Sequence, residues 1–273
     1  MESLPFLISF FNNVDVLMLI MVRVIAFMVF LPILSGMGIP MQARLFTAFV
    51  ISIAIFSSGL VTTATYYDTV VGLVMLLIVE FLAGAFMGFV LSFIMNVLLF
   101  AGQLIDFSMG FAMVNVLDPI QQIQVPVMGN LLFMLVSALL VVNGGVHEFL
   151  RLFFIAYELV PIGSAFIIGN DELAYFIVFS FVGFVILAIM VAMPIIGSMF
   201  IINVCLGIMV KAVPSMNVFV VGMPLKILVG LIIIFIVVLP GMGFIYDMVF
   251  DNAINMLVST IEGMMAVEVP NAG

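Results

Sequence analysis

The sequence predicts an all-α integral membrane protein, and three observations support this. Hydrophobic residues make up 67% of the 273 residues, where a soluble domain has roughly 45–50%. Only 7% of the residues are charged, which is too few to cover the surface of a water-soluble globule. The apolar residues also gather in six long regions. Such regions are typical of helices that cross a bilayer.

The first two regions have the length of single membrane helices, for which about 20 residues suffice. They run from Val16 to Leu34 and from Leu45 to Val61. The first carries Arg23 near its middle. A charge at that depth costs roughly 2.5–3.5 kcal/mol, so Arg23 should face protein or water.

The third region, Val70 to Ala101, is too long for a simple span. As one helix it would be about 48 Å long, while the bilayer core is about 30 Å thick. We therefore expect it to tilt, to break or to leave the bilayer. It carries Glu80, and it contains Gly84 and Gly88, whose spacing lets another helix approach closely.

The later regions suggest kinked helices and helical hairpins. Val127 to Val142 is a plain span, whereas Leu173 to Val210 is over-long and contains Pro194. That region is either one kinked helix or a tight hairpin. The sixth region, Ile227 to Phe250, is interrupted by Pro240-Gly241.

Three of the connections between these regions are informative. Asn143 to Asn170 reads as a semi-polar connection, and Lys211 to Lys226 as a fixed, turn-rich one. With six spans, the few basic residues would place both chain termini in the periplasm. The third connection, Gly102 to Pro126, mixes polar groups with Phe and Met. It is either a movable constriction or an ordinary extramembrane connection.

Two charges inside apolar regions, Arg23 and Glu80, have two interpretations. They form either an ion or proton relay, or a structural contact that fixes packing, which is an interhelical salt bridge or a subunit contact; we favour the structural role. We expect the same structural role for further polar residues. These are Gln103, Asp106, Asn203, Lys211, Asn217 and Lys226.

Several function classes are excluded by the residues present. The net charge is −9, and the nearest two basic residues are 15 positions apart, which argues against nucleic acid as a partner. His147 is the only histidine, and Arg151 stands where a zinc metalloprotease needs its second one. We therefore expect no enzyme, no metal site and no cofactor.

The order and spacing of several motifs resemble the FliR/SctT family of bacterial type III export proteins, over nearly the whole chain. The motifs are Arg23 with Pro32, Gly38-Ile39-Pro40 with Arg44, Gly102 to Asp106, Gly110-Phe111, Asp118-Pro119, Asn203 to Gly207, Lys211, Pro214 to Phe219, Gly222 to Lys226 and Gly230.

The resemblance implies a non-enzymatic channel subunit of a flagellar export gate in the bacterial inner membrane. Its partners would be FliP-like, FliQ-like and FlhB-like subunits, membrane lipid, and unfolded flagellar subunits in transit. The assembly would be raised from the membrane toward the periplasm. The chain itself would resemble FliP (about residues 1–200) and FliQ (about residues 201–273) joined end to end.

The resemblance also places a plug that closes the pore at about Gly110 to Pro126. Apolar bulk that can rearrange around cargo would dewet such a constriction. The gate candidates are Gly110, Phe111, Met113, Val114, Val116, Leu117, Asp118 and Pro119.

The alternative function is a secondary transporter that uses Arg23, Glu80 and Asp106 as a coupling relay. Transporters of that kind usually contain internal repeats, and this sequence shows none.

Overall fold

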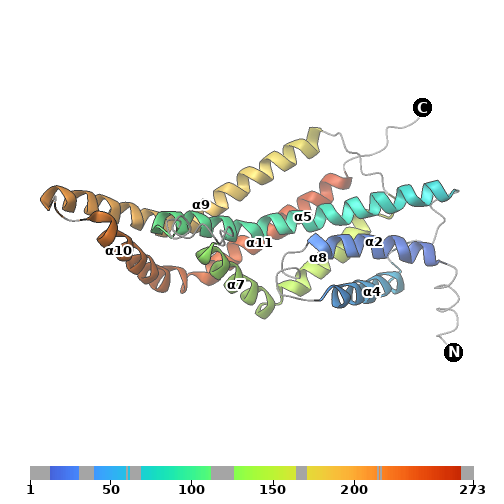
Figure 1. The fold of residues 1–273 in the computed structure, drawn as a ribbon. Helices are drawn as coiled ribbons and strands as arrows, with labels where there is room; N and C mark the ends of the chain where they lie inside the picture. Colours follow the sequence, from blue (N-terminus) through green and yellow to red (C-terminus); the bar gives the residue numbers. More distant parts are fainter. Residues whose placement is uncertain are drawn as a thin grey trace. The chain divides into compact units, whose positions relative to one another are not determined.

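The computed structural model describes residues 13–30, 40–59, 61, 69–111, 126–163, 171–213, 215 and 217–265. Every regular element within these ranges is a helix (Figure 1), which confirms the all-α fold. The chain forms two compact units that interleave along the sequence. Unit 1 comprises Met1–Phe93, Val146–Val178 and Ala253–Gly273, and unit 2 comprises Ile94–Gly145 and Phe179–Asn252.

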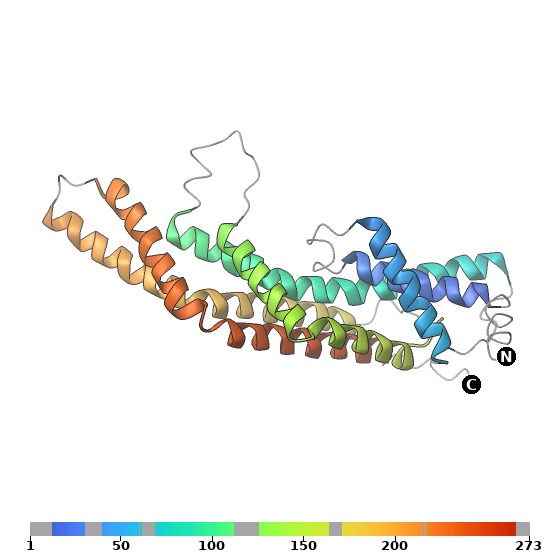
Figure 2. The same cartoon turned by 90° about the horizontal axis from the view of Figure 1, so that it is seen from below.

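Unit 1 is built around α2 (Val14–Phe30), which packs against α4 (Met41–Ser57). Figure 2 shows the crossing of these two helices. The unit also contains the first part of α5 (Val70–Met109) and α8 (Gly145–Leu159). Phe27 of α2 stacks on Phe153 of α8, with ring centroids 4.4 Å apart. An aromatic and aliphatic core therefore joins helices that are distant in sequence.

The two over-long regions are both continuous helices. α5 has 40 residues, which is about 60 Å at the usual rise. α9 (Asp171–Ala212) has 42 residues and contains Pro194, so the region is a helix with an internal proline and not a hairpin. The Ser198 hydroxyl donates to the Pro194 carbonyl at 2.6 Å, within the same turn.

Unit 2 contains the end of α5, α7 (Val127–Val142), most of α9, and α10 (Val218–Ile233). α10 passes into a π-helical turn, η1 (Ile234–Val238), and the chain then turns into α11 (Met242–Met265). The turn lies at Pro240-Gly241, as predicted. Figure 2 shows α10 and α11 in succession.

Two predicted connections are wrong in extent. The semi-polar segment after Asn143 contains α8, whose Glu148–Arg151 pair lies on its exposed side. This helix escaped prediction because it is amphipathic and not uniformly apolar. Only Val213 to Asn217 joins α9 to α10, so Lys226 lies inside a helix and not in a turn-rich connection.

The number of long apolar helices also differs from the six predicted spans. In the ranges that the structure describes, α5, α9 from Val178, and α10 with η1 are long and apolar enough to cross a membrane. α7 and α8 together give a fourth candidate. These helices confirm an all-α membrane protein.

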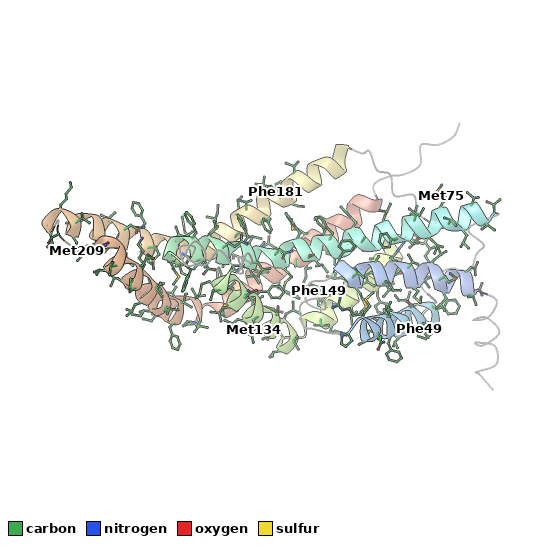
Figure 3. All side chains as sticks on the ribbon, viewed as in Figure 1. Phe49, Met75, Met134, Phe149, Phe181 and Met209 are labelled. Atoms are coloured by element: carbon green, nitrogen blue, oxygen red, sulfur yellow. The ribbon has the colours of Figure 1, made fainter. Side chains whose placement is uncertain are left out.

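Much of the apolar surface of the long helices is exposed within the chain (Figure 3). Met75 on α5 is 60% exposed and Phe181 on α9 is 56% exposed, whereas Phe149 on α8 is buried. Few of the described side chains of α10 and η1 are buried. Lipid or other protein must cover such surfaces.

Candidate functional site

The predicted gate segment leaves the described part of the chain soon after it begins. Gly110 and Phe111 directly follow α5. The other candidates, Met113, Val114, Val116, Leu117, Asp118 and Pro119, lie outside the described residues. The described residues on either side are the end of α5 and the start of α7, both of which belong to unit 2.

The end of α5 is fixed by a glycine turn. Gly110 has φ +90°, a conformation that favours glycine. Its N–H donates to the Phe107 carbonyl at 3.3 Å, and the Phe111 N–H donates to the Asp106 carbonyl at 2.9 Å. This pair of bonds is the Schellman motif, which satisfies the last carbonyl groups of a helix.

The start of α7 depends on a carboxylate from another helix. Its N-cap residue is Pro126, which supplies no side-chain hydrogen bond. The Met128 N–H in the first turn instead donates to both carboxylate oxygens of Asp106, each at 3.3 Å. Asp106 is only 7% exposed. A carboxylate at this position satisfies an otherwise unpaired donor and complements the positive end of the helix dipole.

The same two helices touch one turn away from Asp106. A methyl group on Gly102 of α5 would overlap the backbone of Gly129 on α7. A methyl group on Gly129 would lie 2.8 Å from the Leu99 carbonyl oxygen. Glycine is therefore required on both sides of this crossing, because the backbones themselves are in contact.

Helix α10 covers the end of α5 within unit 2. Met109 lies against Gly230, where any added side chain would overlap its thioether. Met223 of α10 lies next to Gly110, 3.8 Å from where a β-carbon would be. Gly230, one of the residues that carry the family resemblance, therefore supports the end of the helix from which the predicted gate segment leaves.

In unit 1 the structure brings Arg23 and Glu80 together. The Arg23 Nε donates to Glu80 Oε2 at 2.5 Å, and the two side chains are 1% and 0% exposed. The Arg23 Nη1 donates to the Val160 carbonyl at 2.8 Å, just after α8 ends. The other Glu80 oxygen accepts from the Gly163 N–H at 3.0 Å. The pair thus bonds α2, α5 and the turn after α8.

Tyr157 completes this polar junction. The Arg23 guanidinium carbon lies 4.5 Å from the centre of the Tyr157 ring, in a cation–π arrangement. The Tyr157 hydroxyl donates to the Ile20 carbonyl at 3.2 Å. We refer to Arg23, Glu80, Tyr157, Val160 and Gly163 as the Arg23 junction.

Gly84 and Gly88 lie where α5 meets α2. A methyl group on Gly84 would overlap the Arg23 carbonyl oxygen. A methyl group on Gly88 would lie 2.6 Å from the Phe27 carbonyl oxygen. The spacing that suggested close helix packing therefore lies against α2 of the same chain, next to the ion pair.

The remaining polar candidates are dispersed. Gln103, Asn203 and Lys211 are exposed, and Lys226 is half-buried. Asn217 caps α10, because its side-chain oxygen accepts from the Val220 N–H at 3.4 Å. Within the described part of the chain, no three His, Cys, Asp or Glu side chains gather as a metal site would need.

Sequence reasoning missed the partners of the charged residues. The carbonyl of Val160 and the N–H of Gly163 carry no sequence signal as ligands of a salt bridge. The role of Asp106 had one available signal: α7 begins at Val127 after Pro126, without a Ser, Thr, Asp or Asn to cap it. A helix start without its own cap implies a cap from elsewhere.

Comparisons with known proteins fit this architecture. The family model described as bacterial export proteins, family 1, matches residues 14–253. The chain is 29% identical over 251 residues to the flagellar biosynthetic protein FliR of Bacillus subtilis (strain 168), covering 92% of this chain and 94% of that protein. It is 30% identical over 215 residues to FliR of Aquifex aeolicus (strain VF5), covering 78% and 81%.

A relative with a different name is similar too. The Yop proteins translocation protein T of Yersinia pestis is 29% identical over 209 residues, which is 76% of this chain and 80% of that protein. The matched region spans both compact units and every helix that forms the Arg23 junction and the base of the predicted gate segment. The chain belongs to family 1 of the bacterial export proteins, as its resemblance to the FliR/SctT family predicts.

Proposed function

We propose that the chain is a non-enzymatic channel subunit of a flagellar type III export gate in the bacterial inner membrane. Its family membership makes it a component of a bacterial type III protein export apparatus. In this proposal it lines a pore together with FliP-like and FliQ-like subunits, with an FlhB-like subunit attached. Unfolded flagellar subunits pass through that pore.

The observation that carries the proposal is that α5 and α9 are longer than a bilayer is thick and still expose apolar side chains along their length. α5 and α9 are each about twice as long as the bilayer core is thick. Both nevertheless keep apolar side chains exposed along their length. Surface of this kind that extends beyond a bilayer needs protein neighbours, which favours a subunit of an assembly raised from the membrane over a self-contained transporter.

A coupling relay through Arg23, Glu80 and Asp106 has little support. Glu80 and Asp106 are 26 residues apart on one helix, a rise of about 39 Å. Each is engaged by its own local partners. These local contacts favour the channel subunit over the secondary transporter.

The proposed gate is the segment that follows Gly110. Its apolar residues would exclude ions while the channel is at rest, and its Met and Phe side chains would rearrange around an unfolded chain. Of this segment, the structure describes only Gly110 and Phe111, which follow α5.

Deleting Met113 to Leu117 tests this function. We expect the complex to assemble but cells that carry it to become permeable to small ions, because the apolar seal is removed. Phe111→Asp should give a weaker leak by wetting the constriction, and Phe111→Leu should give none. Ion permeability is measured in cells, and assembly is checked by co-purification with the partner subunits. An assembled deletion complex as tight as the parent would contradict the gate.

A further inference from the structure

A single residue of unit 2, Asp106, bonds to both ends of the segment 112–125. Its backbone carbonyl accepts the N–H of Phe111, the last described residue before the segment. Its carboxylate accepts the N–H of Met128, in the first turn after the segment. We infer that Asp106 is a positioning residue that sets the spacing between the two ends of this segment.

Two further contacts make this an anchored arrangement and not a lone helix cap. The glycine crossing of Gly102 and Gly129 holds α5 and α7 at backbone contact one turn before Asp106. Met109 is enclosed by Gly230 of α10, which supports the other side of the α5 end. The segment therefore begins and ends on a fixed base, and we call Gly102, Asp106, Met128 and Gly129 the α5–α7 clamp.

Exposure separates Asp106 from Gln103 on the same helix. Asp106 is buried at the crossing, whereas Gln103, less than one turn earlier, is exposed. Replacing the buried carboxylate removes the acceptor of the Met128 N–H in the first turn of α7. Pro126, the N-cap residue, has no side-chain acceptor to replace it. Gln103→Ala is therefore a matched control: a polar side chain is lost from the same turn of helix without loss of the clamp.

Amide exchange reads the clamp directly. The first N–H groups of a helix have no acceptor within the helix, so protection of the Met128 amide depends on Asp106. The Asn130 amide, two residues later, donates to the Pro126 carbonyl at 3.1 Å and serves as an internal reference. The experiment measures hydrogen–deuterium exchange at these two amides in the complex co-purified with its partners.

Asp106→Ala should speed exchange of the Met128 amide about ten- to a hundredfold, as expected for loss of a bond to a charged acceptor. Asp106→Asn should give an intermediate rate, because one weaker acceptor remains. The Asn130 amide should change much less, and Gln103→Ala should change neither. Equal Met128 exchange in the parent and in both Asp106 variants would overturn the inference.

A distance measurement tests whether the clamp sets the spacing. Spin labels are placed on Phe107→Cys, next to Asp106 on α5, and on Val127→Cys, next to Met128 on α7. Both positions are exposed. Cys205→Ser is added to remove the native thiol. We expect a narrow distance distribution in the parent complex and in Gln103→Ala. Asp106→Asn should broaden it and Asp106→Ala should broaden it further. Unchanged distributions in both Asp106 variants would overturn the positioning role.

The consequence for the seal rests on the proposed channel function. If the segment is the gate, the variant that loosens its base should also leak ions from cells. A broadened distance distribution without an ion leak would support the positioning role of Asp106 and contradict the gate. The two proposals therefore fail by different measurements.

Discussion

The Arg23 junction in unit 1 and the helices α9 and α10, which lie mostly in unit 2, differ in what covers their side chains. In the junction, a charged pair that is costly to bury has found every partner within the chain: a carboxylate, backbone carbonyls and an aromatic ring. Along α9 and α10, apolar side chains such as Phe200 and Leu228 remain exposed. The junction is thus complete within one chain, whereas lipid or other protein must cover the exposed apolar side chains of α9 and α10.

Single substitutions in these two regions should therefore have different effects. A change in the junction should damage the fold of the chain itself. A change on the exposed faces should leave the chain folded and alter how it assembles.

Removing one partner of the buried pair should have the largest effect. Glu80→Ala leaves Arg23 charged, buried and without its carboxylate, which costs about 3–5 kcal/mol. Recovery of the complex from membranes and protein secretion should fall together. Arg151→Ala is the matched control, because its pair with Glu148 is exposed and 3.4 Å long and contributes no more than about 1 kcal/mol.

The opposite result would revise the role of the pair. If Glu80→Ala abolished secretion from a complex recovered in normal amount, a relay would be favoured over a structural salt bridge. Arg23→Lys would sharpen the same test, because lysine keeps the charge but cannot bond Glu80 and the Val160 carbonyl with the fork geometry of arginine.

Adding a methyl group at Gly84 should have the next largest effect. Gly84→Ala forces α5 away from the backbone of α2 at Arg23, and overpacking of this kind costs about 1–3 kcal/mol. Gly197→Ala on α9 adds the same methyl group where nothing lies within 4 Å, and should not destabilise the chain. Thermal unfolding of the purified complexes compares the two. Equal losses would mean that α9 is as closely packed as α5.

The smallest effect is expected at Lys226. It carries the only charge in α10, and it is half-buried. Lys226→Gln keeps a polar tip on a long stem, whereas Lys226→Glu reverses the charge on an otherwise apolar helix. Co-purification with partner subunits should therefore fall more for Lys226→Glu than for Lys226→Gln. Equal and negligible effects would place this side chain in solvent.

Local patterns in the sequence predicted most of the helices. The apolar run from Val127 to Val142 has the bounds of α7. Pro240-Gly241 marks the turn before α11, because neither residue favours a helix interior. α8 was missed since its exposed Glu148 and Arg151 made the segment look like a polar connection.

The sites were less predictable than the helices. The cost of burying charge suggested that Arg23 and Glu80 would each face protein or water, and the structure pairs them with each other. The cost of burying charge gave no information on the Val160 carbonyl, which is 137 positions from Arg23, because nearly every residue carries the same backbone groups. The clamp was hidden for a similar reason: Asp106 acts on the backbone of Met128, and only the three-dimensional crossing at Gly102 brings the two together.

The central claim is that the exposed apolar faces of this chain are covered by other protein subunits. Native mass spectrometry of the tagged chain, purified from membranes in mild detergent, tests this most directly. The account predicts one dominant species far heavier than the 29.8 kDa chain and composed of different subunits. A stable, monodisperse monomer at the mass of the chain alone would contradict it.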